Sequence, residues 1–147
     1  MAGRSRLLRR VTGWRSQLLA WGNAQRYRKF AWGETDCASL VREGLSVVFG
    51  YPVMVLNYAT RSEAKSTMID VVKTASSYLE QHGASRIAVS EIEGGEVVVM
   101  PGLINKMPRL AFAIDHDVLL TSTPHSGPVW MSRGDLSLHA LVYRFGL

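Results

Sequence analysis

The stretch Phe30-Ala31-Trp32-Gly33-Glu34-Thr35-Asp36-Cys37-Ala38-Ser39-Leu40-Val41 contains the only cysteine of the chain, and the other predictions depend on it. Gly33 tolerates the backbone angles of a turn, and Thr35 or Asp36 can cap the first turn of a helix. Apolar residues then recur at helical spacing. The pattern predicts a helix that begins at Cys37 and ends near Gly50.

Cys37 has two interpretations at this position. In the first turn of a helix, unpaired N–H groups and the helix dipole favour a negative charge, which lowers the pKa of a thiol and makes it a candidate nucleophile. A lone cysteine is also a common small apolar residue in a protein core.

The composition is that of a folded domain. The chain has 147 residues, of which 47% are hydrophobic and 20% charged, and this suits one domain with a single core. A single cysteine excludes an intramolecular disulfide and a cysteine-rich zinc site. No apolar run reaches the ~18–20 residues of a membrane span, and no secretory signal peptide is expected.

The positive charge is concentrated at the start of the chain. Residues 1–32 carry a net charge of +8 and residues 33–147 a net charge of −3. The basic residues of this N-terminal arm are Arg4, Arg6, Arg9, Arg10, Arg15, Arg26, Arg28 and Lys29. We weigh three roles for it: packing on the domain, docking on an acidic partner protein, and binding nucleic acid or an anionic membrane surface. Nucleic acid ranks last because no known nucleic-acid module accompanies the charges.

The expected organisation is a basic amphipathic arm, residues 1–29, followed by an α+β domain, residues 30–147. Apolar spacing predicts a helix over residues 4–24 that ends near Gly22 and Asn23. A second helix is expected over about 61–82. Strands are then predicted at 87–89, 97–100, 110–114, 118–121, 129–131 and 140–145. Helices followed by antiparallel strands are typical of the α+β class.

Two segments resemble the papain-like cysteine peptidases of the NlpC class, many of which cleave peptidoglycan. Asp36-Cys37-Ala38-Ser39-Leu40-Val41 matches their nucleophile segment, and Gly95-Glu96-Val97-Val98 matches a Gly-Asp-Val-Val strand. Phe30 to Cys37 also resembles a small family encoded beside tail-tip genes of tailed bacteriophages, and Ala140 to Phe145 resembles the β tail of that family. The resemblance implies an NlpC-type fold with N-terminal helices packed on an antiparallel sheet.

The chain departs from the peptidase pattern at the general base. Where those enzymes begin a strand with His-Val-Gly, this chain has Arg109-Leu110-Ala111. An arginine cannot act as a base because its guanidinium stays protonated, although it can lower the pKa of a nearby thiol. The candidate replacements are His125, in a Pro/Ser/Gly loop, and His139, before the last strand.

The other polar positions have weaker functional interpretations. His82 is expected at a helix end, and His116 in a turn at the far end of its strand. The third polar position of the resemblance falls near Thr121 or Ser122. No ligand set has a recognised zinc or calcium spacing, so neither a metal nor a cofactor is expected.

Two functions follow as expectations. The first is a structural or assembly protein of a phage tail tip or hub with a degenerate peptidase fold, found in the virion and in the host cytoplasm during assembly. Its partners are other tail-tip or hub proteins. The alternative is an active peptidoglycan-cleaving cysteine hydrolase, with Cys37 as the nucleophile and Asp36 or the helix N-terminus tuning it.

Overall fold

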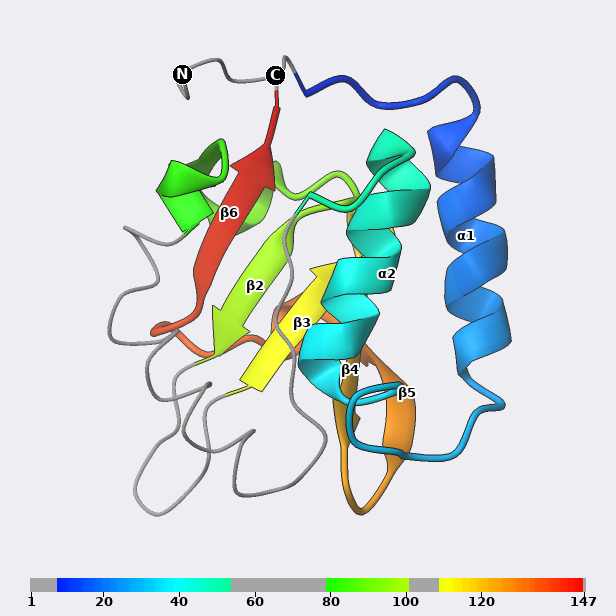
Figure 1. Cartoon of the computed structure of the whole chain (residues 1–147). Coiled ribbons are helices and arrows are strands. Elements are labelled where there is room, and N and C mark those ends of the chain that lie inside the picture. The colour runs from blue at the N-terminus through cyan, green and yellow to red at the C-terminus, as the bar shows by residue number, and fades with distance from the viewer. Residues whose placement is uncertain (1–7, 54–78, 101–108, 147) are drawn as a thin grey trace.

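In the part of the chain that the structure describes, two helices lie against one face of an antiparallel sheet (Figure 1). The computed structural model describes residues 8–53, 79–100 and 109–146. Within them the helices are α1 (Trp14–Gln25) and α2 (Cys37–Phe49). The strands are β1 (Ala84–Ile87), β2 (Val97–Met100), β3 (Arg109–Ala113), β4 (Val118–Thr123), β5 (Gly127–Ser132) and β6 (Leu141–Phe145). Short 3-10 helices follow β1 and β5: η1 (Val89–Glu91) and η2 (Arg133–Asp135). The predicted α+β class is confirmed.

The sheet does not follow chain order. In the described residues its strands are arranged β1-β6-β2-β3-β4-β5, and all the pairs are antiparallel. β6 therefore lies between β1 and β2, with Val97 opposite Tyr143 on one side and Ala84 opposite Phe145 on the other. The last strand is an internal strand of the sheet.

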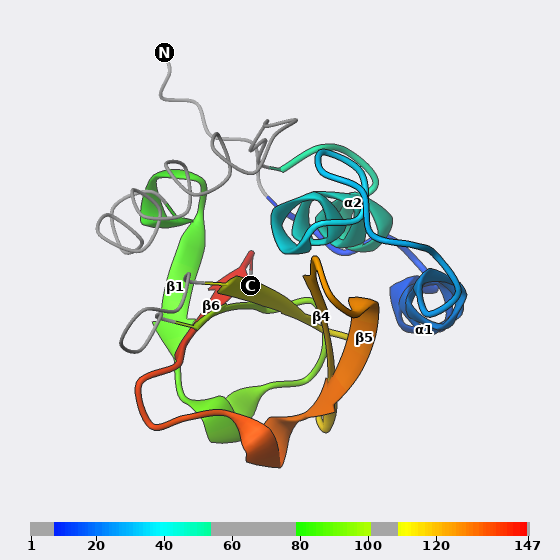
Figure 2. The ribbon, with the colours of Figure 1, turned by 90° about the horizontal axis from the view of Figure 1, so that it is seen from below.

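Both faces of the sheet are covered, which explains why β2 is apolar throughout. Val97 and Val99 face the core beneath the helices, which also contains Phe112 and Leu45. Val98 faces a second, smaller core. The members of that core include Ile92, Ala111, Leu119, Ala140, Val142 and the partly buried Leu136. Figure 2 shows η1 and η2 on the side of the sheet opposite α1 and α2.

The bounds of α2 agree with the sequence prediction. Asp36 is its N-cap, and its carboxylate accepts a hydrogen bond from the backbone N–H of Ser39 at 3.0 Å. Gly50 ends the helix with φ of 78°, a left-handed conformation that glycine adopts without steric cost.

The prediction of a helix over residues 4–24 was wrong at its start within the described part, whereas its end differs by one residue. α1 begins at Trp14 because Gly13, with φ of 77°, turns the chain there. Before that turn the Val11 N–H donates to the Val48 carbonyl of α2 at 2.8 Å, which a continuous helix would not allow. The helix then passes Gly22, where the absence of a side chain leaves room for Ile114, and ends at Gln25.

Several smaller predictions shift by a few residues. The strand expected at 87–89 lies earlier, as β1, because residues 89–91 form η1. β4 and β5 are longer than expected and pair along six positions across a short turn at 124–126. Of the helix predicted over 61–82, only residues 79–82 are described, and 79–81 are helical; residues 61–78 and 103–108 lie outside the described residues.

Candidate functional site

Asp36 is a structural cap with its acceptor capacity largely used. The carboxylate is 1% exposed. One oxygen accepts from the Ser39 N–H, and the other accepts from the Gly33 N–H and from the Ser39 hydroxyl at 2.9 Å. The side chain holds the turn against the first turn of α2, where the helix dipole also stabilises a negative charge.

The turn before α2 is fixed by Thr35 and two aromatic rings. The Thr35 hydroxyl donates to the Lys29 carbonyl at 2.6 Å and accepts from the Ala31 N–H at 2.7 Å. Phe30 and Trp32 pack edge to face with their ring centroids 4.7 Å apart. This segment therefore sets the direction in which α2 enters the core.

Cys37 begins α2 and points into the protein. Its side chain is only 7% exposed. The backbone N–H of Leu110, near the start of β3, donates to the Cys37 sulfur at 3.4 Å. The start of α2 and the start of β3 are thus brought together.

The sulfur lies where β3 and β4 separate. In this strand pair Phe112 lies opposite Leu120 and Ala113 lies opposite Leu119. At Leu110 the N–H donates to Cys37, and the carbonyl accepts from the Thr121 hydroxyl at 2.8 Å. Side chains from α2 and β4 therefore replace ladder hydrogen bonds at this end of the strand pair.

The expectation of a lowered thiol pKa was wrong. Burial raises the pKa of Cys37 to about 11. The Leu110 N–H and the Arg109 charge act in the opposite direction, while the Asp36 carboxylate raises the pKa further. Desolvation outweighs the hydrogen bond, so the helix start does not produce a thiolate here.

Arg109 lies beside the residue that contacts the thiol. It is the first residue of β3, next to Leu110, and it is exposed. Its charge reaches Cys37 and lowers the pKa of the thiol, but less than burial raises it.

Neither candidate replacement base contacts the thiol. His125 is exposed in the turn between β4 and β5. That turn lies at the same end of the molecule as the start of α2 (Figure 1), and the neighbouring Gly127 packs on the backbone of residues 28–30. His139 is exposed in the loop before β6. Within the described residues, the sulfur's hydrogen-bond partner is the Leu110 amide.

The remaining polar candidates have structural positions. Thr121 is buried and bonds to Leu110, whereas the buried Ser122 hydroxyl has no hydrogen-bond partner among the described residues. His116 lies in the exposed turn between β3 and β4, 3.7 Å from the Asp117 carboxylate. His82 follows the helical residues 79–81, and its N–H donates to the Leu79 carbonyl.

A buried ion pair was not predicted from the sequence. Glu96 is fully buried, and its carboxylate accepts from the N–H groups of Glu93 and Gly94 at 3.1 and 2.7 Å. The Arg144 guanidinium donates to the same carboxylate at 3.0 and 3.2 Å and to the Glu91 carbonyl at 2.6 Å. The available signal was a single charge directly before one apolar strand and a single charge inside another.

The described basic residues have different surroundings. Arg10 is partly buried, 4.9 Å from the centroid of the Trp14 ring, and burial lowers its pKa while the Glu96 charge raises it. Arg28 donates to Gln25 at 2.7 Å and pairs with Glu43 at 3.4 Å. Arg9, Arg15, Arg26 and Lys29 are exposed, and Arg4 and Arg6 lie outside the described residues.

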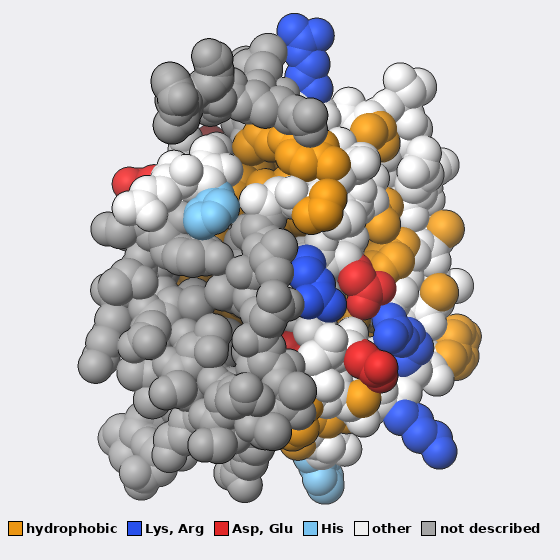
Figure 3. Space-filling view, viewed as in Figure 1, with side chains coloured by type: hydrophobic (Ala, Val, Ile, Leu, Met, Phe, Trp, Pro, Cys, Tyr) orange, Lys and Arg blue, Asp and Glu red, His pale blue; other side chains and the backbone are white. Residues whose placement is uncertain are grey.

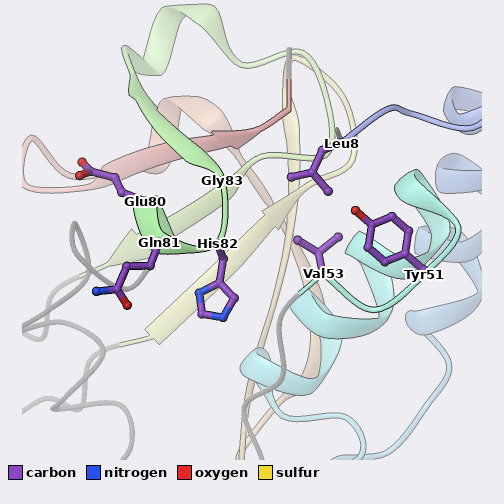
Figure 4. Close-up of a pocket in the computed structure, with 7 residues that line it drawn as sticks. All are labelled: Leu8, Tyr51, Val53, Glu80, Gln81, His82 and Gly83. Atoms are coloured by element: carbon purple, nitrogen blue, oxygen red, sulfur yellow. The ribbon is translucent and has the colours of Figure 1, made fainter. Parts of the chain in front are cut away.

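A surface cleft of about 420 Å³ lies away from Cys37. Its lining residues are Leu8, Tyr51, Val53, Glu80, Gln81, His82 and Gly83. Figure 4 shows Leu8, Tyr51 and Val53 pointing toward a shared space, with Glu80 and Gln81 pointing away from it. None of the sequence-predicted catalytic residues lines this cleft.

The described ranges contain neither a candidate metal centre nor a membrane-spanning helix. No group of three or more His, Cys, Asp and Glu side chains there could hold a metal ion. No helix in the same ranges has both the length and the apolar character needed to cross a membrane.

Together these features define an α+β protein in which a cysteine-headed helix packs on an antiparallel sheet and its thiol is buried against a strand. A domain of unknown function, DUF6950, matches residues 9–139, and the chain belongs to that family. No curated protein matches the chain.

Proposed function

We propose that this protein is a non-catalytic structural or assembly component of a bacteriophage tail tip or hub, built on an NlpC-type papain-like fold. The resemblance of residues 30–37, 95–98 and 140–145 to tail-tip proteins supports the context. Its partners are other tail-tip or hub proteins. It acts in the virion and is present in the host cytoplasm during assembly.

The state of Cys37 carries the proposal. A thiol with a pKa of about 11 is a thiolate in about one molecule in ten thousand at pH 7, and the thiolate is the nucleophile. The sulfur is also buried and accepts a backbone hydrogen bond, so a substrate carbonyl has no access to it in this conformation.

The surroundings of Cys37 supply no proton acceptor in the described residues. Arg109 stays protonated. His125 and His139 are both exposed and make no hydrogen bond to the sulfur. Asp36 is occupied as a cap rather than positioned to orient an imidazole.

A second candidate function is a cysteine hydrolase acting on peptidoglycan. The contact between the start of α2 and the start of β3 favours it, because the resemblance implies that nucleophile and base lie at these two places. This function requires a rearrangement that exposes the sulfur and a base from a displaced histidine or a partner subunit.

The deciding experiment compares wild-type and Cys37→Ala protein in phage. We expect the protein in purified virions, equal yields of infectious particles with either form, and no release of muropeptides from purified cell wall by assembled wild-type tails. Cell-wall cleavage that is lost in Cys37→Ala establishes the hydrolase instead. Absence of the protein from virions, with unchanged tail assembly after deletion of its gene, contradicts both the structural and the assembly role.

A further inference from the structure

The surface of α1 that borders β5 has an exposed stripe of mixed basic and apolar residues. Residues 15, 19, 23 and 26 fall on one side of the helix because they are spaced by three or four positions. Arg15 and Arg26 are exposed, and Leu19 between them is 52% exposed. Tyr27, which follows directly, is 78% exposed.

Aromatic rings hold the two arginines in place. The Arg26 guanidinium lies 4.7 Å from the centroid of the Trp130 ring of β5 and 5.9 Å from that of Tyr27. Trp130 is itself fixed to α1 by its indole N–H, which donates to the Gly22 carbonyl at 3.2 Å. The Arg15 guanidinium lies 4.4 Å from the Trp14 ring centroid. Stacking restricts these side chains before a ligand arrives, which lowers the entropy lost on binding.

The charges of this stripe are not neutralised within the described part of the chain. Arg15 donates to the Glu93 carbonyl at 3.4 Å and Arg26 to the Asn23 side chain at 3.4 Å, and neither forms an ion pair there. Helix α1 contains no acidic residue. The stripe therefore complements carboxylates.

The stripe is short and is flanked by acidic residues. From Arg15 to Arg26 it spans about 16 Å at the helical rise of 1.5 Å per residue. Arg28, beyond one end, is paired with Glu43. Figure 3 shows acidic and basic side chains next to each other on the face over α2, so this face is not a continuous positive surface for a polyanion. A short patch with exposed Leu and Tyr side chains fits one protein segment better than a nucleic-acid backbone.

We propose that the stripe Arg15, Leu19, Arg26 and Tyr27, beside Trp130, is a docking surface for an acidic amphipathic segment of a neighbouring protein, about three helical turns long. Carboxylates of that segment pair with the two arginines, and its apolar side chains pack on Leu19 and Tyr27. This inference rests on the proposed assembly role and names the chemistry of the partner.

The test uses the full chain and a synthetic probe. The probe is an 18-residue amidated peptide with leucine and glutamate on one helical face, and its counterpart carries lysine in place of glutamate. We expect saturable binding of the glutamate peptide, measured by fluorescence anisotropy at 150 mM salt, and none of the lysine peptide. Arg15→Glu with Arg26→Glu should weaken the affinity at least tenfold, and Tyr27→Ala about threefold.

Arg86→Glu is the matched control, because Arg86 is an exposed arginine on β1 at the opposite edge of the sheet. It makes a single charge reversal elsewhere and should leave the affinity within twofold. Thermal unfolding of each variant checks that the fold is retained. Equal losses with Arg86→Glu, tighter binding of duplex DNA or single-stranded RNA than of the peptide, or self-association that blocks the peptide overturns the inference.

This readout is independent of the phage experiments. If the protein binds the peptide but is absent from virions and dispensable for tail assembly, the proposed function is refuted and the docking surface still stands. If the protein is incorporated into virions but does not bind the peptide, the docking surface is refuted and the proposed function still stands.

Discussion

Two buried carboxylates, Asp36 and Glu96, lie near opposite ends of α2, and they are neutralised differently. Asp36 sits at the N-terminus, where N–H groups and one hydroxyl satisfy it and the helix dipole favours its charge. Glu96 lies directly before β2, and its carboxylate accepts from the backbone N–H groups of Glu93 and Gly94 in the preceding turn. There the structure adds a cation, Arg144, to two N–H groups.

The difference shows that an acidic residue in a motif-like segment can be structural for two separate physical reasons. Asp36 adjoins a thiol that stays neutral because burial raises its pKa. Glu96 belongs to a charged centre that is balanced within the protein. Neither carboxylate is available to orient a catalytic base. Four measurements test how Glu96, Asp36 and the neighbouring Cys37 contribute to the stability of the fold.

The largest expected effect comes from breaking the Glu96 centre. Arg144→Ala leaves a fully buried carboxylate without its paired cation, and we expect the free energy of unfolding to fall by about 3–5 kcal/mol. Urea unfolding followed by circular dichroism measures it. Arg86→Ala, at an exposed position on β1, is the control and should change stability by less than about 0.5 kcal/mol. A loss below about 1 kcal/mol for Arg144→Ala contradicts the assigned role of the pair.

The second effect depends on pH and concerns Cys37. In the unfolded chain the thiol ionises near its ordinary pKa of about 9, whereas in the folded protein it stays neutral up to about 11. The stabilising contribution is complete below pH 9 and is lost as the pH rises to 11. We expect wild type to lose about 2–3 kcal/mol relative to Cys37→Ala over this range. Parallel pH dependences for the two proteins would show that the thiol is not desolvated.

Removing the cap at the other end of α2 should cost less. Asp36→Ala deletes the acceptor for the Ser39 and Gly33 N–H groups, and we expect a loss of about 2 kcal/mol. Asp36→Asn, which keeps one acceptor oxygen, should recover roughly half of that loss. Chemical unfolding at pH 7 gives both values, and equal losses for the two variants would mean that the carboxylate's charge, not its capping geometry, matters.

The smallest effect is expected from Cys37→Ala at pH 7. The substitution removes one buried atom and a weak acceptor from the Leu110 N–H, so about 1 kcal/mol should be lost. Because the thiol's contribution disappears at alkaline pH, the variant should become the more stable protein near pH 11. Alkylation of the native wild-type thiol by iodoacetamide at pH 8 should be far slower than in urea; equal rates would contradict its burial.

Local patterns predicted much of this fold. The Asp36 cap and Gly50 fixed the bounds of α2, and the Val97–Met100 run indicated a central strand because both of its faces are buried. The start of α1 was missed because a positive φ at Gly13 depends on where Val11 bonds to α2, and the N-terminal sequence alone does not contain that contact.

The site was harder to predict because burial decides its chemistry. The position of Cys37 in a first turn was readable from the sequence, but the desolvation that raises its pKa comes from β3 and the surrounding core. The Glu96–Arg144 ion pair could not be predicted from the sequence, because the two residues meet only when β6 lies beside β2.

The internal position of β6 has a consequence for synthesis on the ribosome. β1 pairs with β6 in the described sheet, and β2 needs β6 on one of its two edges. Until residues 141–145 leave the exit tunnel, β1 has no partner strand among the described residues and the edge of β2 that pairs with β6 stays open. The two halves of the sheet therefore join only after translation of these residues, and a nascent chain stalled before them would expose an edge to other chains.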